Sequence, residues 1–192
     1  MKKYYLLLAL LLSVSMAALA FAEWNHYAID ERVSATFPAA PQEVDVAKLM
    51  ASQGKPLPTG FQSRMLITKD ETGMYQLMRF TNPALKAFTQ QNRTAYFDGI
   101  AAGMVKNNGV IKERTPISTP AGDGYEFRVR SVQPQTGKPF TMYTRMLLLQ
   151  EVGYMLTFVG PDLEDSTGVG SIAQRQQFFN SLAVKKAVLH EH

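Results

Sequence analysis

Apolar and polar residues alternate in several segments of the first half of the chain, and a period of two predicts β-strands. The clearest case is Val33–Phe37, in which Val33, Ala35 and Phe37 fall on one side of an extended chain. Pro38 ends this strand, because proline donates no hydrogen bond to a neighbouring strand. The other strands predicted here span residues 24–29, 61–69 and 74–81, and the last two form a hairpin around Asp70-Glu71-Thr72-Gly73.

In two places the apolar period lengthens to about 3.6 residues, which predicts an amphipathic helix in each. The first helix begins near Gln90 and ends before Asn107-Asn108-Gly109, and the second spans about residues 171–183. The expected buried stripe of the first helix is Tyr96, Phe97, Ile100, Ala101 and Met104. That of the second helix is Ile172, Phe178, Phe179 and Leu182. Residues 44–50 fit either a short strand or a helical turn.

Four more strands are expected between the two helices, at residues 110–118, 124–132, 140–149 and 154–160. Their connections contain Ala121-Gly122-Asp123, Gln135-Thr136-Gly137 and Glu151-Val152-Gly153, each with a glycine, which favours a turn. The chain is therefore predicted to be a single α+β domain over residues 23–192. Its fold is an antiparallel β-sheet of about six to eight strands packed with two main helices, in the order strands, helix, strands, helix.

The N-terminus has the pattern of a secretory signal peptide. Met1-Lys2-Lys3 supplies positive charge, an apolar run follows from Tyr4, and Ala20-Phe21-Ala22 offers small residues for cleavage. Cleavage after Ala20 fits as well, but we expect it after Ala22, because Glu23 then opens a polar mature chain. The alternative is an uncleaved membrane anchor, because residues 4–22 approach the roughly 20 apolar residues that span a bilayer.

Composition narrows the function classes. The chain has no cysteine, which excludes disulfides, thiol catalysis, thiolate metal sites and lipid attachment through a cysteine. Removing Lys2 and Lys3 with the leader leaves 18 of the 20 basic residues against 16 acidic ones. A balance this even does not indicate nucleic acid as a partner. The ten methionines are dispersed through the predicted elements, so we interpret them as core residues and not as a copper-binding run.

Several local phrases resemble the PsbP-like fold. They are Ser34-Ala35-Thr36-Phe37-Pro38-Ala39-Ala40-Pro41, Tyr75-Gln76-Leu77-Met78-Arg79-Phe80-Thr81-Asn82-Pro83, Gly124-Tyr125-Glu126-Phe127, Arg145, Tyr154 and Phe178-Phe179-Asn180-Ser181-Leu182. That group includes the photosystem subunit that names it, a Ran-binding nuclear import factor and bacterial envelope proteins such as the DcrB-like lipoproteins. The resemblance implies the fold but no catalytic motif. Lipoprotein members need a cysteine at the cleavage site, so a related chain without one is a soluble version.

Four sets of residues are candidates for a site of chemistry, and none of them predicts one. Gly168-Val169-Gly170-Ser171-Ile172-Ala173 resembles a dinucleotide loop, but the chain ends too soon for the required βαβ unit, so we expect a loop and helix cap. His190-Glu191-His192 lacks a third fixed imidazole, so no metal site is predicted. The chain has no G-x-S-x-G elbow, and His26 is interpreted as a surface or edge residue. The carboxylates Asp98, Asp123, Glu126 and Asp162 are scattered and mark no catalytic pair.

Five arginines within predicted strands are the remaining candidates for a ligand site: Arg64, Arg79, Arg128, Arg130 and Arg145. If strand pairing brings several of them to one exposed face, they form a patch suited to carboxylate or phosphate. Alternatively, their stems cover a solvent-facing sheet, with Glu126 and other acids as partners. We expect the second arrangement and keep the first as a hypothesis.

These patterns predict an exported protein, periplasmic or secreted, that is not an enzyme and acts by binding an envelope protein or a small anionic ligand. No cofactor is predicted. One alternative is a periplasmic hydrolase or other enzyme with an unrecognised site, and another is a membrane-tethered accessory subunit whose leader stays uncleaved. Neither the ligand nor the oligomeric state follows from the sequence.

Overall fold

The structure is a computed structural model. It describes residues 24–52, 54–55, 57–83, 85, 90–105, 109–119, 122–133, 136–160 and 171–185. The predicted leader with its cleavage at Ala22, the glycines of the Gly168 motif, Asp162 and the terminal His190-Glu191-His192 lie outside these residues. Among the described residues, no helix is both long enough and apolar enough to cross a membrane.

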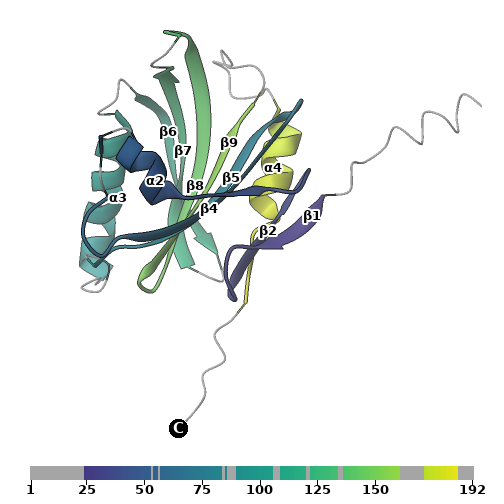
Figure 1. Ribbon diagram of the computed structural model, residues 1–192. Coiled ribbons are helices and arrows are strands. Elements are labelled where there is room, and N and C mark those ends of the chain that lie inside the picture. Colours follow the sequence, from purple (N-terminus) through teal and green to yellow (C-terminus); the bar gives the residue numbers. More distant parts are fainter. Residues whose placement is uncertain are drawn as a thin grey trace, which may run out of the picture.

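A seven-stranded sheet forms the centre of the molecule (Figure 1), and its strands follow the order β3-β4-β5-β9-β8-β7-β6. The strands are β3 Gln42–Val44, β4 Gln62–Asp70, β5 Gly73–Thr81, β6 Val110–Thr119, β7 Gly122–Val132, β8 Pro139–Leu149 and β9 Val152–Val159. All neighbours pair antiparallel. The predicted hairpin is therefore confirmed as β4–β5. The α+β class is confirmed as well.

A second sheet of three strands holds both ends of the described chain. It contains β1 Asn25–Ala28, β2 Val33–Phe37 and β10 Ala183–Val184, in the order β1-β2-β10. The sequence predicted helix through residue 183, and this was wrong. Helix α4, Ile172–Asn180, ends earlier because the Ser181 hydroxyl donates to the carbonyl of Phe178 at 2.7 Å and accepts from the amide of Thr36 at 2.9 Å. This turns the chain onto β2.

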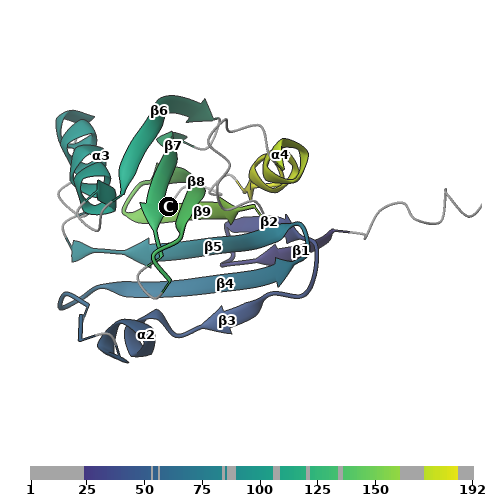
Figure 2. The same ribbon diagram turned by 90° about the horizontal axis from the view of Figure 1, so that it is seen from above.

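The small sheet and α4 cover one face of the large sheet, which we call the α4 face (Figure 2). On this face Leu77, Tyr154, Leu156 and Phe158 are at most 1% exposed. Phe178 of α4 lies between the two sheets, with its ring centroid 5.3 Å from those of Phe37 and Tyr75. The alternation predicted for β2 is confirmed, because Val33, Ala35 and Phe37 are all buried here.

The opposite face carries helix α3, Gln90–Val105, and is called the α3 face. Phe97 and Ala101 are buried against it, and the remaining residues of the predicted stripe pack there in part. Of residues 44–50, whose pattern fits either a strand or a helix, Val44 ends strand β3 and the residues from Val46 lie in helix α2, Val46–Ser52. Ile172 was expected in the core, but its residue is 41% exposed because it lies at the first turn of α4, away from the sheet.

Candidate functional site

The strand register places all five predicted arginines on the α4 face. Directly opposed residues of an antiparallel pair share a face, as do residues two apart on one strand. Arg64 lies opposite Arg79, and Arg79 opposite Tyr154. Tyr154 in turn lies opposite Leu147, which places Arg145 on the same face of β8. Glu126 lies opposite Arg145, and Arg128 and Arg130 follow it at alternate positions of β7.

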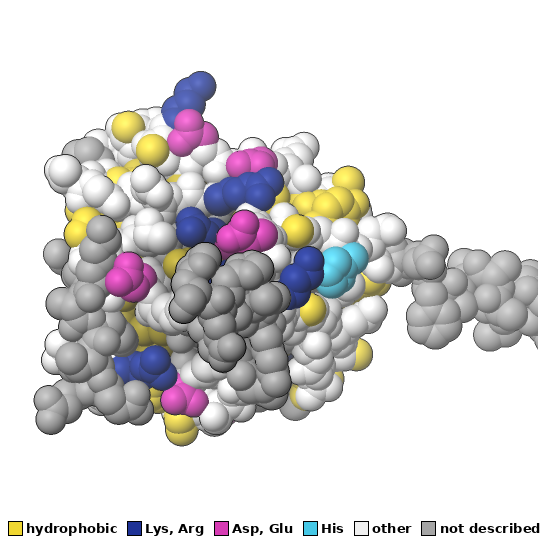
Figure 3. Space-filling model, turned by 90° about the horizontal axis from the view of Figure 1, so that it is seen from below, with side chains coloured by type: hydrophobic (Ala, Val, Ile, Leu, Met, Phe, Trp, Pro, Cys, Tyr) yellow, Lys and Arg dark blue, Asp and Glu magenta, His cyan; other side chains and the backbone are white. Residues whose placement is uncertain are grey.

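These arginines do not form a patch of one sign. Four are in ion pairs with acidic side chains: Arg64 with Glu43, Arg79 with Asp30, Arg128 with Glu113, and Arg145 with Glu126. Within the part of the chain that the structure describes, Arg130 has no ion pair. On the surface drawn in Figure 3, acidic and basic groups lie beside one another. The arginines thus lie on one face of the sheet but belong to two groups, Arg64 and Arg79 on β4 and β5, and Arg128, Arg130 and Arg145 on β7 and β8.

The first group ties the two sheets together. Asp30, in the turn between β1 and β2, accepts hydrogen bonds from Arg79 Nε at 2.9 Å and from the Tyr154 hydroxyl at 2.7 Å. Its other carboxylate oxygen accepts from the amides of Arg32 and Val33. Burial raises the pKa of Asp30, but these hydrogen bonds and the charge of Arg79 outweigh it, so the pKa is lowered overall. This cluster has a structural role, since its charges are mutually satisfied.

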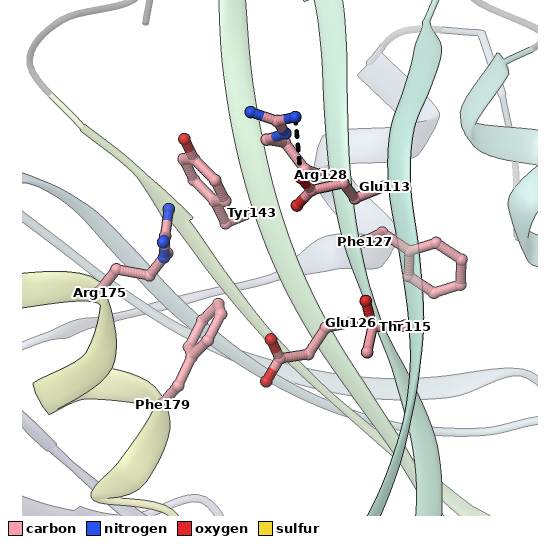
Figure 4. A pocket seen from close by; sticks show the side chains of 8 residues that line it. All are labelled: Glu113, Thr115, Glu126, Phe127, Arg128, Tyr143, Arg175 and Phe179. Atoms are coloured by element: carbon pink, nitrogen blue, oxygen red, sulfur yellow. Dashed lines mark hydrogen bonds and ion pairs between the residues drawn. The ribbon is translucent and has the colours of Figure 1, made fainter. Parts of the chain in front are cut away.

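Arg128 of the second group lines a polar pocket between α4 and strands β6, β7 and β8 (Figure 4), and Arg145 contacts two of the residues that line it, Glu126 and Phe179. The pocket has a volume of about 110 Å³. The residues that line it are Glu113, Thr115, Glu126, Phe127, Arg128, Tyr143, Arg175 and Phe179. Figure 4 shows Phe127 pointing to the far side of the sheet, whereas Arg175 and Phe179 extend from α4 toward the sheet.

Aromatic rings and ion pairs fix the cationic side chains of this pocket. The Arg175 guanidinium carbon lies 3.9 Å from the centroid of the Tyr143 ring, a stacking distance. Arg145 donates to the carboxylate of Glu126 at 2.7 Å and to the carbonyl of Phe179 at 2.8 Å, which fixes the last turn of α4 against the sheet. Among the described residues that line the pocket, Arg128 and Arg175 accompany Glu113 and Glu126, so two basic groups face two acidic ones.

The Arg128–Glu113 pair joins a covered arginine to an exposed acid. The two groups are 3.0 Å apart, and the side chain of Arg128 is 15% exposed while that of Glu113 is 62% exposed. The arginine is held by the sheet, whereas its partner reaches it from the outer strand β6. A solvent-exposed acid contributes little to such a pair. An external carboxylate or phosphate can therefore take the place of Glu113 without leaving a buried charge unpaired.

Sequence reasoning identified Arg128 and Arg145 but not Arg175 or Tyr143. One signal was present, because Arg175 and Phe179 are four residues apart and so lie on one side of α4. The scattered acids Asp98, Asp123 and Glu126 prove to be partners of Arg114, Arg93 and Arg145. His26 lies exposed on the outer strand β1, as predicted. Among the described residues, no cluster of three histidine or acidic side chains could hold a metal ion.

Comparisons with known proteins leave the family open. No family model and no curated protein matches this sequence. A crystal structure from Bacteroides thetaiotaomicron aligns at a TM-score of 0.46 and 14% identity, over 86% of this chain and 50% of that one. The chain thus spans about half the length of that protein. A protein of unknown function from Pseudomonas aeruginosa aligns at a TM-score of 0.38 and 9% identity, over 81% of this chain and 94% of that one. Neither likeness carries a conclusion.

Proposed function

We propose that this chain is an exported, non-catalytic binding protein with a PsbP-like fold. Its pocket beside α4 holds an acidic group, a carboxylate or phosphate, of a small ligand or an envelope partner. The observation that carries the proposal is the exchangeable pair: Arg128 is fixed and largely covered, and its partner Glu113 is exposed. An incoming anion replaces one carboxylate with another and so costs little in lost interactions.

The second support is the arrangement of donors around that position. Guanidinium groups present their N–H donors in one plane and match carboxylate and phosphate oxygens in pairs. Arg175 lines the pocket from α4 and Arg128 lines it from β7, so cations from two different elements border the same space. With a volume of about 110 Å³, the pocket admits an acidic group and excludes a whole drug-sized molecule, which needs about 300 Å³ or more. The rest of the ligand then lies outside.

Binding, and not acid–base catalysis, is the role that these contacts favour. A general acid or base must lie within hydrogen-bond reach of the proton that it moves. Here the carboxylates of Glu113 and Glu126 are instead engaged in ion pairs with Arg128 and Arg145. The proposal of export rests on the leader pattern of residues 1–22. The intact mass of the protein recovered from its own cells would show whether cleavage follows Ala22.

The binding proposal is tested by calorimetric titration with inorganic phosphate, acetate, glutamate and citrate at low salt. We expect Arg175→Gln and Arg128→Gln each to weaken the tightest of these at least tenfold, because a charge-assisted hydrogen bond contributes about 1.5–3 kcal/mol. Arg130→Gln is the matched control, since Arg130 shares the strand and face of Arg128 but does not line the pocket.

One variant separates this proposal from nonspecific charge attraction. Glu113→Gln removes the competing carboxylate, so it should tighten anion binding several-fold. Glu43→Gln also removes one negative charge, but away from the pocket, and should leave anion binding unchanged. Anions that fail to bind at millimolar concentration, or that bind equally well to both arginine variants, would remove the basis for the proposal.

A further inference from the structure

The six methionines located in strands all lie on the α3 face of the large sheet. Met65 lies opposite Met78, Met78 opposite Met155, and Met155 opposite Met146, so four adjacent strands each contribute one sulfur side chain to a row. The other two lie on the same face at the other end of β5 and β8: Met74 and Met142. We call these six residues the methionine face.

The two faces of the central strands differ in how well they are covered. On the α4 face, Leu77 of β5 and Leu156 of β9 are completely buried. On the methionine face, Met78 and Met155 of the same strands are only half-buried, as are Met74 and Met142. Methionine is frequent at surfaces that bind varied apolar ligands, because its flexible thioether side chain adapts to them.

At the Met74 end, this face opens into a hollow of about 580 Å³. Its apolar lining includes Met74 and Val159, which are directly opposed on β5 and β9, together with Phe140 of β8. The volume falls within the range of about 300–1,000 Å³ typical of small-molecule sites. Lys69, Asp70, Glu71 and Gln133 also line it, so the polar lining contains one base, two acids and a neutral amide. This lining does not select an anionic headgroup, and the apolar lining provides the recognition.

A polar layer closes the hollow toward the methionine row. Gln76, Thr157 and Thr144 lie opposite one another on β5, β9 and β8, two residues along from the Met74 level. Both threonines are at most 3% exposed, and their hydroxyl groups are 3.4 Å apart. An apolar ligand therefore gains contact only until it reaches this layer, so the length that it can bury is limited.

We propose that this hollow binds a linear acyl chain, contributed by a free fatty acid or by a phospholipid. A flexible, unbranched chain conforms to a lining of methionine, valine and one phenylalanine ring. The site is separate from the arginine pocket, because the two are on opposite faces of the sheet. Either can exist without the other.

A chain-length series tests the proposal. Saturated fatty acids from hexanoate to tetradecanoate, and lysophosphatidylcholines of the same lengths, compete with a fluorescent fatty acid for the full-length protein. Each added CH₂ group should lower Kd about fourfold until the hollow is filled, after which Kd levels off. A Kd that does not change with chain length would overturn the proposal. Binding of the fatty acids without the lysolipids identifies the free acid as the source, and binding of both identifies a shared acyl site.

Variants at Met74 distinguish an apolar chain from a soft metal ion. Met74→Gln should weaken the best fatty acid at least fivefold, whereas Met74→Leu should stay within twofold because the site needs volume and not sulfur. Met50→Gln, in α2 and outside the hollow, is the control. Equal losses in Met74→Leu and Met74→Gln, accompanied by Ag⁺ binding to the wild type, would reject the acyl chain in favour of a thioether metal site.

Two further variants keep the result interpretable. If Met74→Gln fails to fold, Val159→Thr places a hydroxyl in the same hollow at nearly constant volume and should weaken binding in the same way. Arg175→Gln should leave acyl binding unchanged, so that a failed anion site and a failed acyl site give different patterns of loss. Full acyl affinity in both Met74→Gln and Val159→Thr would place the ligand elsewhere.

Discussion

Replacing Asp30 by asparagine removes one charge and tests how the small sheet is held on the large one. The carboxylate accepts four hydrogen bonds, two from backbone amides and two from Tyr154 and Arg79. The asparagine side chain has the same shape but only one oxygen. Whichever way its amide is oriented, two donors of the protein face an NH₂ group, which is itself a donor.

The expected loss follows from these contacts. A hydrogen bond to a charged group contributes about 1.5–3 kcal/mol. The loss is smaller than the sum of two such bonds, because the Tyr154 hydroxyl can turn to accept and the Arg79 side chain is 29% exposed to water. We therefore expect Asp30→Asn to lower the free energy of unfolding by about 2–3 kcal/mol. Tyr154→Phe should lower it by about 1–2 kcal/mol, and the double variant by less than the two losses together.

Urea unfolding monitored by circular dichroism measures this loss, and its pH dependence gives a second check. The folded-state pKa of Asp30 is lowered, so the stabilisation is fully present above the unfolded value of about 3.9 and declines as the pH falls through the folded value. The gap between wild type and Asp30→Asn should therefore be constant from pH 5 to 7 and narrow below about pH 4. Glu43→Gln is the control, because it breaks an exposed pair and should leave stability almost unchanged. A loss below about 0.5 kcal/mol, or a gap that does not narrow in acid, would refute the role given to Asp30.

Two further predictions concern packing and tyrosine ionisation. Gly153→Ala should lower the free energy of unfolding by about 2–3 kcal/mol, because the added Cβ would overlap the Phe80 ring. Gly99→Ala in α3 should raise it by about 0.5–1 kcal/mol, since nothing lies near its Cβ position. Thermal unfolding of both variants checks the opposite signs, and equal shifts of the melting temperature would contradict the assigned packing. Burial raises the pKa of Tyr75 and of Tyr96 to about 12. Absorbance at 295 nm should therefore show a tyrosine titration step at high pH that is smaller in Tyr75→Phe and in Tyr96→Phe. Complete ionisation of all tyrosines in the native protein by pH 11 would contradict this prediction.

The strands were predictable because alternation is a local signal. The hairpin of β4 and β5, and the buried positions of β2, follow from residues that are neighbours in the sequence. β10 was missed because it is two residues long and is made by a tertiary contact, the hydrogen bond from the Thr36 amide to Ser181. No local pattern marks a strand whose only partner lies 150 residues earlier in the chain.

The candidate sites depend on strand order, which the sequence does not encode locally. That the five arginines share one face follows only once β9 is placed between β5 and β8. The same order aligns Met65, Met78, Met155 and Met146, which looked dispersed along the sequence and were interpreted as core residues. The interpretation as core residues is right for Met65 and Met146, which are buried. It is incomplete for Met78 and Met155, which are only half-buried.

Because the small sheet joins β1 and β2 to β10, it cannot close until residues 183–184 have been synthesised. Phe37 and Tyr75 acquire the ring of Phe178 only when residues 171–185 have emerged. A nascent chain halted at Gly160 would therefore expose the core of its α4 face, because Phe178 and Phe179 would be missing from it. In a series of stalled chains, protease resistance should rise sharply only when the length passes residue 185, and resistance at Gly160 would show that the large sheet folds alone.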